Sequence, residues 1–367
     1  MLNKSKILSI NAQFSSDISK KYGLYAGVGY YRQRMAARYL KEYTFVHAGK
    51  ELLVPKDDLQ KVIPELVKNA NLVHTQRIDN PHTIVALLGA CDFYNVPLIV
   101  DLDDHVFTTD GLAHDKHTYE DTDHKHYLEI LLKEATALTV STPPLVEEYK
   151  EYNPNIYLVP NAVDPKDWTW PLRHHTRPTV GWAGTMAHIV DHQVLEPVYA
   201  GVVSEHPDVV FSFVGHMLPD HIKGIQRSNW EIKPGISWWE GNPDSDMTYP
   251  RLLSLLGYDI GVAPLIGSQY NNARSLAKWF EYTMAGIPTV ASAWGPYLDL
   301  ASGTDVLLAQ TTEQWVEHIN HLFKNKHERD AIVDNARERI AREFTIDHTL
   351  PEWRSVFAKH LGYGFPK

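Results

Sequence analysis

The segment Asn271–Ser292 (NNARSLAKWFEYTMAGIPTVAS) carries two cations and a carboxylate at helical spacing. Arg274 and Lys278 are four residues apart and Lys278 and Glu281 three apart, so in a helix they share one face. Cations near a helix start, where backbone N–H groups are free, suit a diphosphate, and a carboxylate one turn later can accept two ribose hydroxyls. A solvated helix with a Lys–Glu pair explains the same spacing, so the pattern alone leaves both interpretations open.

A second candidate phosphate site lies at Val180–His192 (VGWAGTMAHIVDH), where a predicted strand is followed by a Gly-Thr turn and a helix start. Small residues at Gly184 and Thr185 let the backbone approach a phosphate and point N–H groups at it. His188 follows within one turn. A Gly-Thr turn alone is a weak signal, and the strand before it and the cationic helix later in the chain strengthen it.

Acidic residues end a predicted buried strand at Val100–Phe107 (VDLDDHVF). Asp103, Asp104 and His105 are candidates for a catalytic role, since parallel strands carry ligands at their carboxyl ends. Asp101 and Asp103 also resemble a pair of oxygen ligands for Mn²⁺ or Mg²⁺. Such a site would be expected on a single Rossmann-like domain, and the second half of the chain would then have no role. Loop capping by Asp side chains explains the same residues.

A glycine-rich stretch near the N-terminus contains Gly27 and Gly29 and leads into Arg32. It is either a flexible surface turn or the wall of a binding site. In the second case Arg32 is a candidate contact for an acceptor or a leaving phosphate. The many histidines do not follow a standard zinc spacing, so no metal site is expected.

Short apolar runs alternate with helical patterns along the whole chain, which predicts a parallel sheet covered by helices on both faces. Two such series, separated by a stretch rich in Pro, Trp, His and Arg, predict two Rossmann-like domains. The first series predicts strands at Lys6–Asn11, Phe45–His47, Leu72–His74, Val96–Leu102, Ala137–Ser141 and Ile156–Val159, and helices at Tyr30–Leu40, Thr83–Tyr94, Tyr127–Ala135 and Pro144–Tyr152. The second predicts strands at Thr179–Ala183, Val209–Val214, Ile236–Glu240, Ile260–Ala263 and Pro288–Ser292, and helices at Leu195–His206, Tyr249–Leu256, Ser275–Ala285, His327–Glu343 and Leu350–Leu361.

Composition narrows the class of protein. The formal net charge is −10, which does not fit a general nucleic-acid binder, because phosphate contacts need surplus Lys and Arg. The single cysteine, Cys91, can form no internal disulfide and is expected to be a small buried residue. No run of eighteen apolar residues and no signal peptide are recognised, so we expect no membrane span and a cytoplasmic location.

The run Glu281–Val290 (EYTMAGIPTV) resembles the donor-binding motif of the large retaining glycosyltransferase family 4, also called group 1, in which a glutamate precedes an Ala-Met-Ala-Gly-x-Pro-Val-Val-like run. The resemblance implies that Glu281 binds the ribose. The family's other glutamate, which contacts the donor sugar, would fall on Ala273, so it is absent here. In the family a Gly-Arg pair binds the diphosphate; Gly184 matches the glycine and Thr185 stands in place of the arginine. Asn271, Asn272 or Arg274 are candidates to take over the sugar contact.

The segments STPPLVEEY and IYLVPNAVDP are similar to the family's end-of-domain signature, with Ser141, Asn161 and Asp164 matching. The resemblance implies a GT-B fold, an α/β architecture of two Rossmann-like domains facing each other across a cleft, with the C-terminal helix crossing back to the first domain. It divides the chain into residues 1–165 (acceptor side), 166–178 (linker), 179–345 (donor domain) and 346–367 (returning helix). The donor-binding residues implied are Gly184, Thr185, His188, Glu240, Gly241, Asn272, Arg274, Ser275, Lys278 and Glu281.

The function implied is transfer of a sugar from a nucleotide sugar to an unidentified acceptor, with retention and without a metal or other cofactor. The co-substrate is a UDP-, GDP-, ADP- or dTDP-sugar, and the acceptor is a saccharide, a lipid-linked sugar or, against the acidic charge, a modified nucleic acid. Three alternatives stay open: a nucleotide-sugar epimerase of the same fold, a phage-type DNA glycosyltransferase, and a non-catalytic binding protein. The oligomeric state is not predicted.

Overall fold

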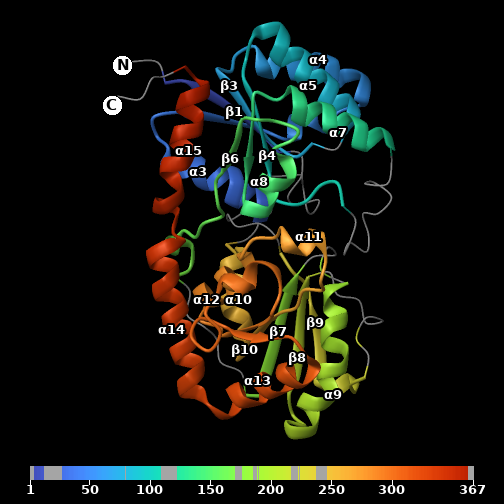
Figure 1. The fold of residues 1–367 in the computed structure, drawn as a ribbon, viewed down its shortest axis with the longest axis vertical. Helices are drawn as coiled ribbons and strands as arrows, with labels where there is room; N and C mark the ends of the chain where they lie inside the picture. The colour runs from blue at the N-terminus through green and yellow to red at the C-terminus, as the bar shows by residue number, and fades with distance from the viewer. Residues whose placement is uncertain are drawn as a thin grey trace.

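The structure is a computed structural model that describes residues 4–11, 27–78, 80–108, 122–169, 176–184, 188, 190–215, 222, 224–236 and 246–362. Two lobes are stacked along the long axis of the molecule (Figure 1). Each is built on a six-stranded sheet, with strand orders β2-β1-β3-β4-β5-β6 and β12-β11-β10-β7-β8-β9, and all pairs of neighbouring strands are parallel. We call these lobes the first and the second domain. Two parallel α/β sheets confirm the predicted fold class.

The first domain alternates strands and helices, as the apolar runs predict. Its strands are β1 Lys6–Ile10, β2 Thr44–Ala48, β3 Leu72–Gln76, β4 Leu98–Leu102, β5 Ala137–Val140 and β6 Ile156–Leu158. Its helices are α2 Gly27–Gly29, a π-helix at Tyr30–Arg34, α3 Met35–Tyr39, a 3₁₀ turn at Lys50–Leu52, α4 Lys56–Val67, α5 Pro81–Tyr94, α7 Thr122–Glu134 and α8 Pro143–Tyr149. The sequence interpretation did not foresee α4, which contains Pro64.

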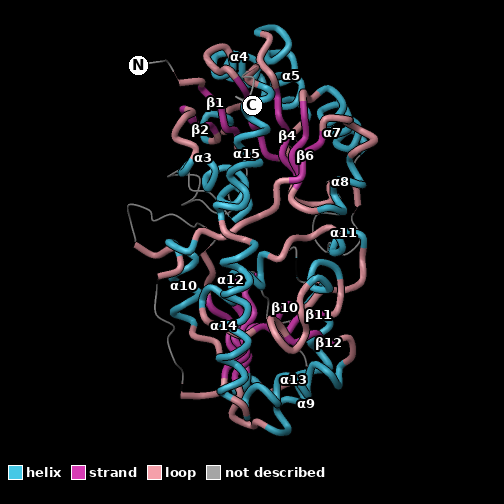
Figure 2. Tube along the Cα trace, turned by 60° about the vertical axis from the view of Figure 1, so that its left-hand side comes forward, coloured by secondary structure: helices cyan, strands magenta, loops and turns pink. Residues whose placement is uncertain are grey.

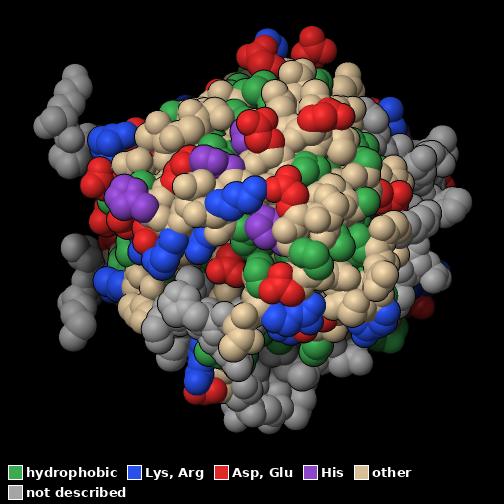
Figure 3. Space-filling model, turned by 90° about the horizontal axis from the view of Figure 1, so that it is seen from below, with side chains coloured by type: hydrophobic (Ala, Val, Ile, Leu, Met, Phe, Trp, Pro, Cys, Tyr) green, Lys and Arg blue, Asp and Glu red, His purple; other side chains and the backbone are tan. Residues whose placement is uncertain are grey.

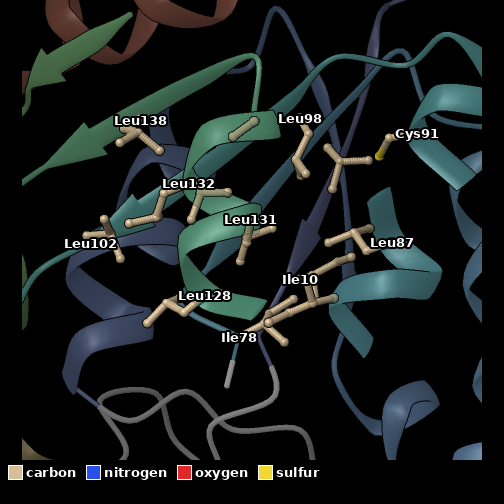
Figure 4. Close-up of a cluster of buried hydrophobic side chains, with 14 of the residues drawn as sticks. Ile10, Ile78, Leu87, Cys91, Leu98, Leu102, Leu128, Leu131, Leu132 and Leu138 are labelled. Carbon is tan, nitrogen blue, oxygen red and sulfur yellow. The ribbon is translucent and has the colours of Figure 1, made fainter. Parts of the chain in front are cut away.

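Alternate residues of the first sheet face opposite layers of helices, since successive side chains of a strand point to opposite faces. Leu98, Leu102 and Leu138 pack with side chains of α5 and α7 on one face (Figure 4). Cys91 lies in this cluster, and burial raises the pKa of its thiol to about 12, as expected of an unreactive buried cysteine. The opposite face packs on α3 and α15 through Ile7, Leu72, Ile99 and Ala137.

The second domain repeats the pattern with a different packing. Its strands are β7 Thr179–Gly184, β8 Val210–Gly215, β9 Trp230–Lys233, β10 Ile260–Ala263, β11 Thr289–Ser292 and β12 Leu307–Ala309. Its helices are α9 Glu196–Glu205, α10 Tyr249–Leu256, α11 Gln269–Asn272, α12 Ala277–Ala285, α13 Thr312–Lys324 and α14 Lys326–Glu343, with 3₁₀ turns at Asp191–Leu195, Arg227–Asn229 and Gly295–Asp299. Small residues on one face leave room for large aromatic rings: a Cβ on Gly181 would lie 1.8 Å from the ring of Tyr258.

The C-terminal helix returns to the first domain. Helix α14 runs along the second domain and α15, Ile346–His360, along the first (Figures 1 and 2). The chain passes between the domains near Val163 and again near Phe344–Ile346, and the two segments are hydrogen-bonded to each other. Val163 N donates to Phe344 O and Ile346 N donates to Val163 O, both at 2.8 Å. Trp353 and Phe357 of α15 then pack against the first sheet, which confirms the predicted return.

Two element predictions are wrong in detail. The strand expected at Ile236–Glu240 is not formed at Ile236, and residues 237–240 lie outside the described part of the chain. Strand β9 instead ends at Lys233, before Pro234, which has no N–H to donate to a neighbouring strand. The helix expected at Ser275–Ala285 begins only at Ala277. No helix among the described residues has both the length and the apolar character needed to cross a bilayer.

Candidate functional site

Lys278 is a buried cation in the first turn of α12. Its Nζ donates to the carbonyl oxygen of Ala183, near the carboxyl end of β7, and lies 5.5 Å from the centre of the Trp182 ring. No carboxylate among the described residues lies within salt-bridge distance of it. Burial, which outweighs the attraction of Glu281, lowers the pKa of Lys278 to about 8. Lys278 is therefore a desolvated cation with no anion paired to it in the described part of the chain.

Arg274 lies between α11 and α12 rather than on the helix, which corrects the expectation that it shares a helical face with Lys278. Its Nη1 lies 2.9 Å from His188 Nε2, its Nη2 donates to the Tyr270 hydroxyl at 3.1 Å, and its guanidinium stacks 4.6 Å from that ring. Its Nε is buried and has no acceptor among the described residues. Burial opposes its charge, but interactions with Tyr270 and Asp104 outweigh burial and raise its pKa. A donor with no acceptor in the described part of the chain, on a residue whose charge acts on Lys278, suits an anionic ligand.

A relay of hydrogen bonds orients Arg274. Burial and the nearby cations lower the pKa of His188 well below its ordinary value, so its ring is neutral. Since Nε2 accepts from Arg274, Nδ1 carries the proton and donates to Asp191 Oδ2 at 3.2 Å. Asp191 Oδ1 accepts from Asn271 Nδ2 at 2.6 Å and from Ile266 N at 3.0 Å. Sequence reasoning did not assign this role to Asp191, although its spacing of three residues from His188 was a usable signal.

Glu281 is held by two tyrosines from different domains. Its Oε2 accepts from the Tyr249 hydroxyl at 2.9 Å, and its Oε1 from the Tyr31 hydroxyl at 3.4 Å. Tyr31 belongs to the π-helix of the first domain and Tyr249 to α10 of the second. Burial raises the pKa of Glu281, opposed by Lys278. Both carboxylate oxygens therefore bind hydroxyl groups, the same chemistry as a bound ribose diol.

Glycines line the carboxyl edge of the second sheet. Gly184 and Gly215 are paired across β7 and β8. A Cβ on Gly184 would lie 2.3 Å from the Trp182 ring, and one on Gly215, whose φ is +108°, would lie 2.0 Å from the Gly184 carbonyl oxygen. Backbone rather than side chains therefore forms this edge. Three predicted donor-binding residues, Thr185, Glu240 and Gly241, lie outside the described residues.

Asp103 and Asp104 follow β4 in the first domain and are half-buried. Burial, with the charges of Asp104 and Asp101, raises the pKa of Asp103 to about 8, so at neutral pH it is mostly a neutral acid. Asp104 acts electrostatically on Arg274, although the two residues belong to different domains. The structure therefore brings the acidic loop of the first domain toward the cationic loop of the second.

His105, the third catalytic candidate, is buried beside α8. Its Nε2 lies 3.1 Å from Glu148 Oε2, and its ring packs 6.3 Å from that of Tyr149. Its Nδ1 is buried and has no partner among the described residues. His105 thus keeps one ring nitrogen for a further hydrogen bond.

Arg32 bonds to Asp101, Val159 and Asn161 of its own domain, which does not fit its predicted role in binding an acceptor or leaving phosphate. Its side chain is fully buried in an ion pair with Asp101 at 2.8 Å, which leaves Asp101 paired with a cation rather than open to a metal ion. Gly27 and Gly29 form the short helix α2 with φ in the ordinary range, not a flexible turn. No group of three or more metal-binding side chains occurs within the described ranges.

Two predicted donor-binding residues next to Arg274 differ in their surroundings. Asn272 ends α11 and is exposed to solvent. Ser275 Oγ accepts from Asn161 Nδ2 of the first domain at 3.0 Å. The structure therefore gathers Gly184, His188, Arg274, Ser275, Lys278 and Glu281 where the second domain meets the first.

Comparison with solved structures defines the class of architecture. A glycosyltransferase from Rickettsia africae superimposes with a TM-score of 0.64 at 14% identity, covering 99% of this chain and 100% of that one. Anabaena HepE in complex with UDP-glucose gives 0.66 at 12% identity, covering 96% and 99%. Sucrose-phosphate synthase from Thermosynechococcus elongatus gives 0.64 at 13% identity, covering 98% and 99%. The chain has the GT-B fold.

The family comparison points to the same class. Residues 251–355, from α10 into α15, match the family model described as glycosyl transferase-like. This range contains Arg274, Lys278 and Glu281, so the resemblance to GT-B glycosyltransferases drawn from the motif is confirmed. No curated protein matches the chain significantly.

Proposed function

We propose that the protein is a glycosyltransferase that transfers a sugar from a nucleoside diphosphate sugar to an acceptor. The observation that carries the proposal is the pair Arg274 and Lys278, one half-buried and one buried cation with no salt bridge to any described residue. Keeping such charges desolvated is costly, and a diphosphate would offset the cost. Residues 1–165 would then form the acceptor side and residues 179–345 the donor side.

In this proposal the donor binds along the α11–α12 segment. Its diphosphate binds Lys278 Nζ and the unpaired Nε of Arg274, with the backbone at Gly184 beside it. Its ribose displaces the tyrosine hydroxyls from Glu281. HepE binds UDP-glucose in the same fold, which supports a UDP-sugar over the GDP-, ADP- and dTDP-sugars.

The chemistry proposed is charge stabilisation. As the bond from the sugar to the diphosphate breaks, negative charge grows on the leaving group next to Arg274 and Lys278. We propose that these cations serve in place of a metal ion and that the reaction proceeds with retention, as in family 4. Asp103, Asp104 and His105 approach the sugar from the first domain.

Thermal shift with UDP-, GDP-, ADP- and dTDP-glucose identifies the donor, since a ligand that binds only the native state raises the melting temperature. Turnover is then measured against a panel of saccharide and lipid-linked acceptors, for the wild type, Lys278→Met and Glu281→Gln. Both variants should lose at least tenfold in kcat/KM. Addition of a chelator tests metal independence, and NMR of the product's anomeric proton tests retention. Wild-type protein that binds none of the four nucleotide sugars would contradict the proposal.

An epimerase is the second candidate. The chain resembles a putative UDP-N-acetylglucosamine 2-epimerase from Listeria monocytogenes with a TM-score of 0.56 at 13% identity, covering 98% and 97%. Asp103, with a pKa of about 8, could serve as the acid in such a reaction. Incubation with UDP-N-acetylglucosamine and no acceptor separates the two: an epimerase converts the sugar, whereas a transferase at most hydrolyses it.

A nucleic-acid acceptor needs a basic surface. The formal net charge is −10, which leaves no surplus of Lys and Arg, and the one face seen in Figure 3, the far end of the second domain, intersperses acidic, basic and apolar side chains. We therefore propose a saccharide or lipid-linked acceptor. A cytoplasmic location remains a prediction from the sequence.

A further inference from the structure

The loop Ala273–Ser275 of the second domain is bound to the first domain at two points. The Thr142 hydroxyl donates to the Ala273 carbonyl oxygen at 2.7 Å, and this contact is buried. Two residues later, Asn161 Nδ2 donates to Ser275 Oγ at 3.0 Å. Both first-domain partners follow strands of the first sheet, Thr142 after β5 and Asn161 after β6. The loop that carries Arg274 is thus attached to the opposite domain on either side of that residue.

The Thr142 hydroxyl bonds to the other domain and does not cap its own helix. Thr142 stands at the N-cap of α8, where a threonine hydroxyl usually accepts from a backbone N–H of the first turn. Here the Thr142 side chain makes no capping bond, and the N–H of Leu145 at the third helical position donates to the backbone carbonyl oxygen of Thr142 at 3.2 Å. The Thr142 hydroxyl donates instead to the Ala273 carbonyl oxygen of the other domain.

The side-chain amide of Asn161 is fixed by a hydrogen bond within the first domain. Its Oδ1 accepts from Arg32 Nη1 at 3.2 Å, and the same guanidinium pairs with Asp101 and lies 5.0 Å from the Trp353 ring of α15. Arg32 and Asp101 are fully buried. A packed side-chain network of the first domain therefore fixes the amide that reaches Ser275.

Arg274, between the two attachment points, turns back into its own domain. Its side chain contacts His188 and Tyr270, while the backbone on either side is tied to Thr142 and Asn161. Its position thus depends on the first domain through its backbone and on the second through its side chain. Losing either attachment frees the loop to shift relative to His188.

We propose that Thr142 and Asn161 are positioning residues, which hold the Arg274 guanidinium at the diphosphate only while the two domains are docked as in this structure. The inference rests on the proposed function, since it assigns these first-domain residues to the donor site of the second domain. It explains how a donor site built on one domain can depend on contact with the other.

The test uses the full-length protein with UDP-glucose and the acceptor found in the panel. Thr142→Val keeps the shape of the side chain and removes the hydroxyl, and Ser275→Ala removes the acceptor of Asn161. Each should lower kcat/KM about five- to tenfold, the effect of one buried hydrogen bond. Thr142→Ser and Ser275→Thr keep a hydroxyl and should restore activity. Ser204→Ala, which removes an exposed hydroxyl on α9, is the control.

A double-mutant cycle with Arg274→Ala separates positioning from general weakening of the fold. If the attachments act through Arg274, Thr142→Val should cause no further loss of kcat/KM in the Arg274→Ala background. Equal loss in both backgrounds would overturn the inference, as would wild-type activity in Thr142→Val and Ser275→Ala. Failure of wild-type protein to bind or turn over UDP-glucose would instead count against the proposed function and its choice of donor.

Discussion

Binding of the nucleotide sugar should be accompanied by proton uptake at Lys278. The pKa of this residue is lowered from 10.5 to about 8, which corresponds to about 3 kcal/mol of opposition to its charged form. Because a diphosphate favours the ammonium, binding should return the pKa toward its ordinary value or above it. Near pH 9 about one-tenth of Lys278 is protonated without ligand and nearly all of it with ligand, so each binding event takes up about 0.9 proton.

Isothermal titration calorimetry with UDP-glucose in buffers of different ionisation enthalpy measures this uptake. Near pH 6 the proton uptake should approach zero, because Lys278 is already charged. The affinity for UDP-glucose near pH 9 should be about tenfold weaker than at neutral pH. Lys278→Arg is the matched control, since a guanidinium stays charged throughout. Asp103, whose pKa is also about 8, titrates in the same range, so Asp103→Asn is measured in parallel.

Two results would refute the reasoning. One is equal proton uptake near pH 9 in the wild type and in Lys278→Arg, which would place the titrating group elsewhere. The other is uptake that disappears in Asp103→Asn while Lys278 is intact. The sign also matters for stability: since the folded pKa of Lys278 is lowered, the unfolded chain binds more protons between about pH 8 and 10.5, and this residue's contribution makes the free protein more stable as pH rises through that window.

Other predictions concern the scaffold and the relay. Gly181→Ala should destabilise the fold by about 1–3 kcal/mol or more, because the new Cβ would lie 1.8 Å from an aromatic ring. Gly89→Ala, which has open space around it in a helix, should stabilise the fold by about 0.5–1 kcal/mol. Urea unfolding measures both changes. Arg32→Met should cost about 3–5 kcal/mol by leaving a buried charge unpaired, and adding Asp101→Asn should recover part of the loss in the same assay. His188→Phe should raise the donor KM about five- to tenfold. Because the pKa of His188 is well below its ordinary value, wild-type affinity for UDP-glucose should show no histidine step from pH 5.5 to 7, and calorimetry would detect one.

The sheets could be predicted because buried parallel strands are short continuous apolar runs. Val96–Leu102 and Val209–Val214 are such runs. Strand β4 lies within the first run, and β8 is shifted by one residue from the second, to Val210–Gly215. Short elements whose local signal is weak were missed, and so were two longer helices, α4 and α13. Strand β12 has three residues, and the 3₁₀ and π segments follow no simple period.

Site residues near each other in the chain were easier to group than those joined by the fold. Lys278 and Glu281 share α12, so their spacing carried the information. Arg32 was misassigned because its partner, Asp101, is 69 residues away and becomes its neighbour only in the folded sheet. Tyr31, which contacts Glu281 from 250 residues away, could not be found from spacing at all.

The departure at Ala273 is explained by its place in the fold. Its side chain is 2% exposed and packs in the core cluster of the first domain, and its carbonyl oxygen is taken by Thr142. A glutamate there would bury a charge against an apolar core unless the domains moved apart, at a cost of several kcal/mol. The position that the resembling family uses to contact the sugar is here used to dock one domain on the other. A sugar bound beside Arg274 would therefore have to be contacted from elsewhere, and Asp104 of the first domain, which acts electrostatically on that arginine, is a candidate for the contact.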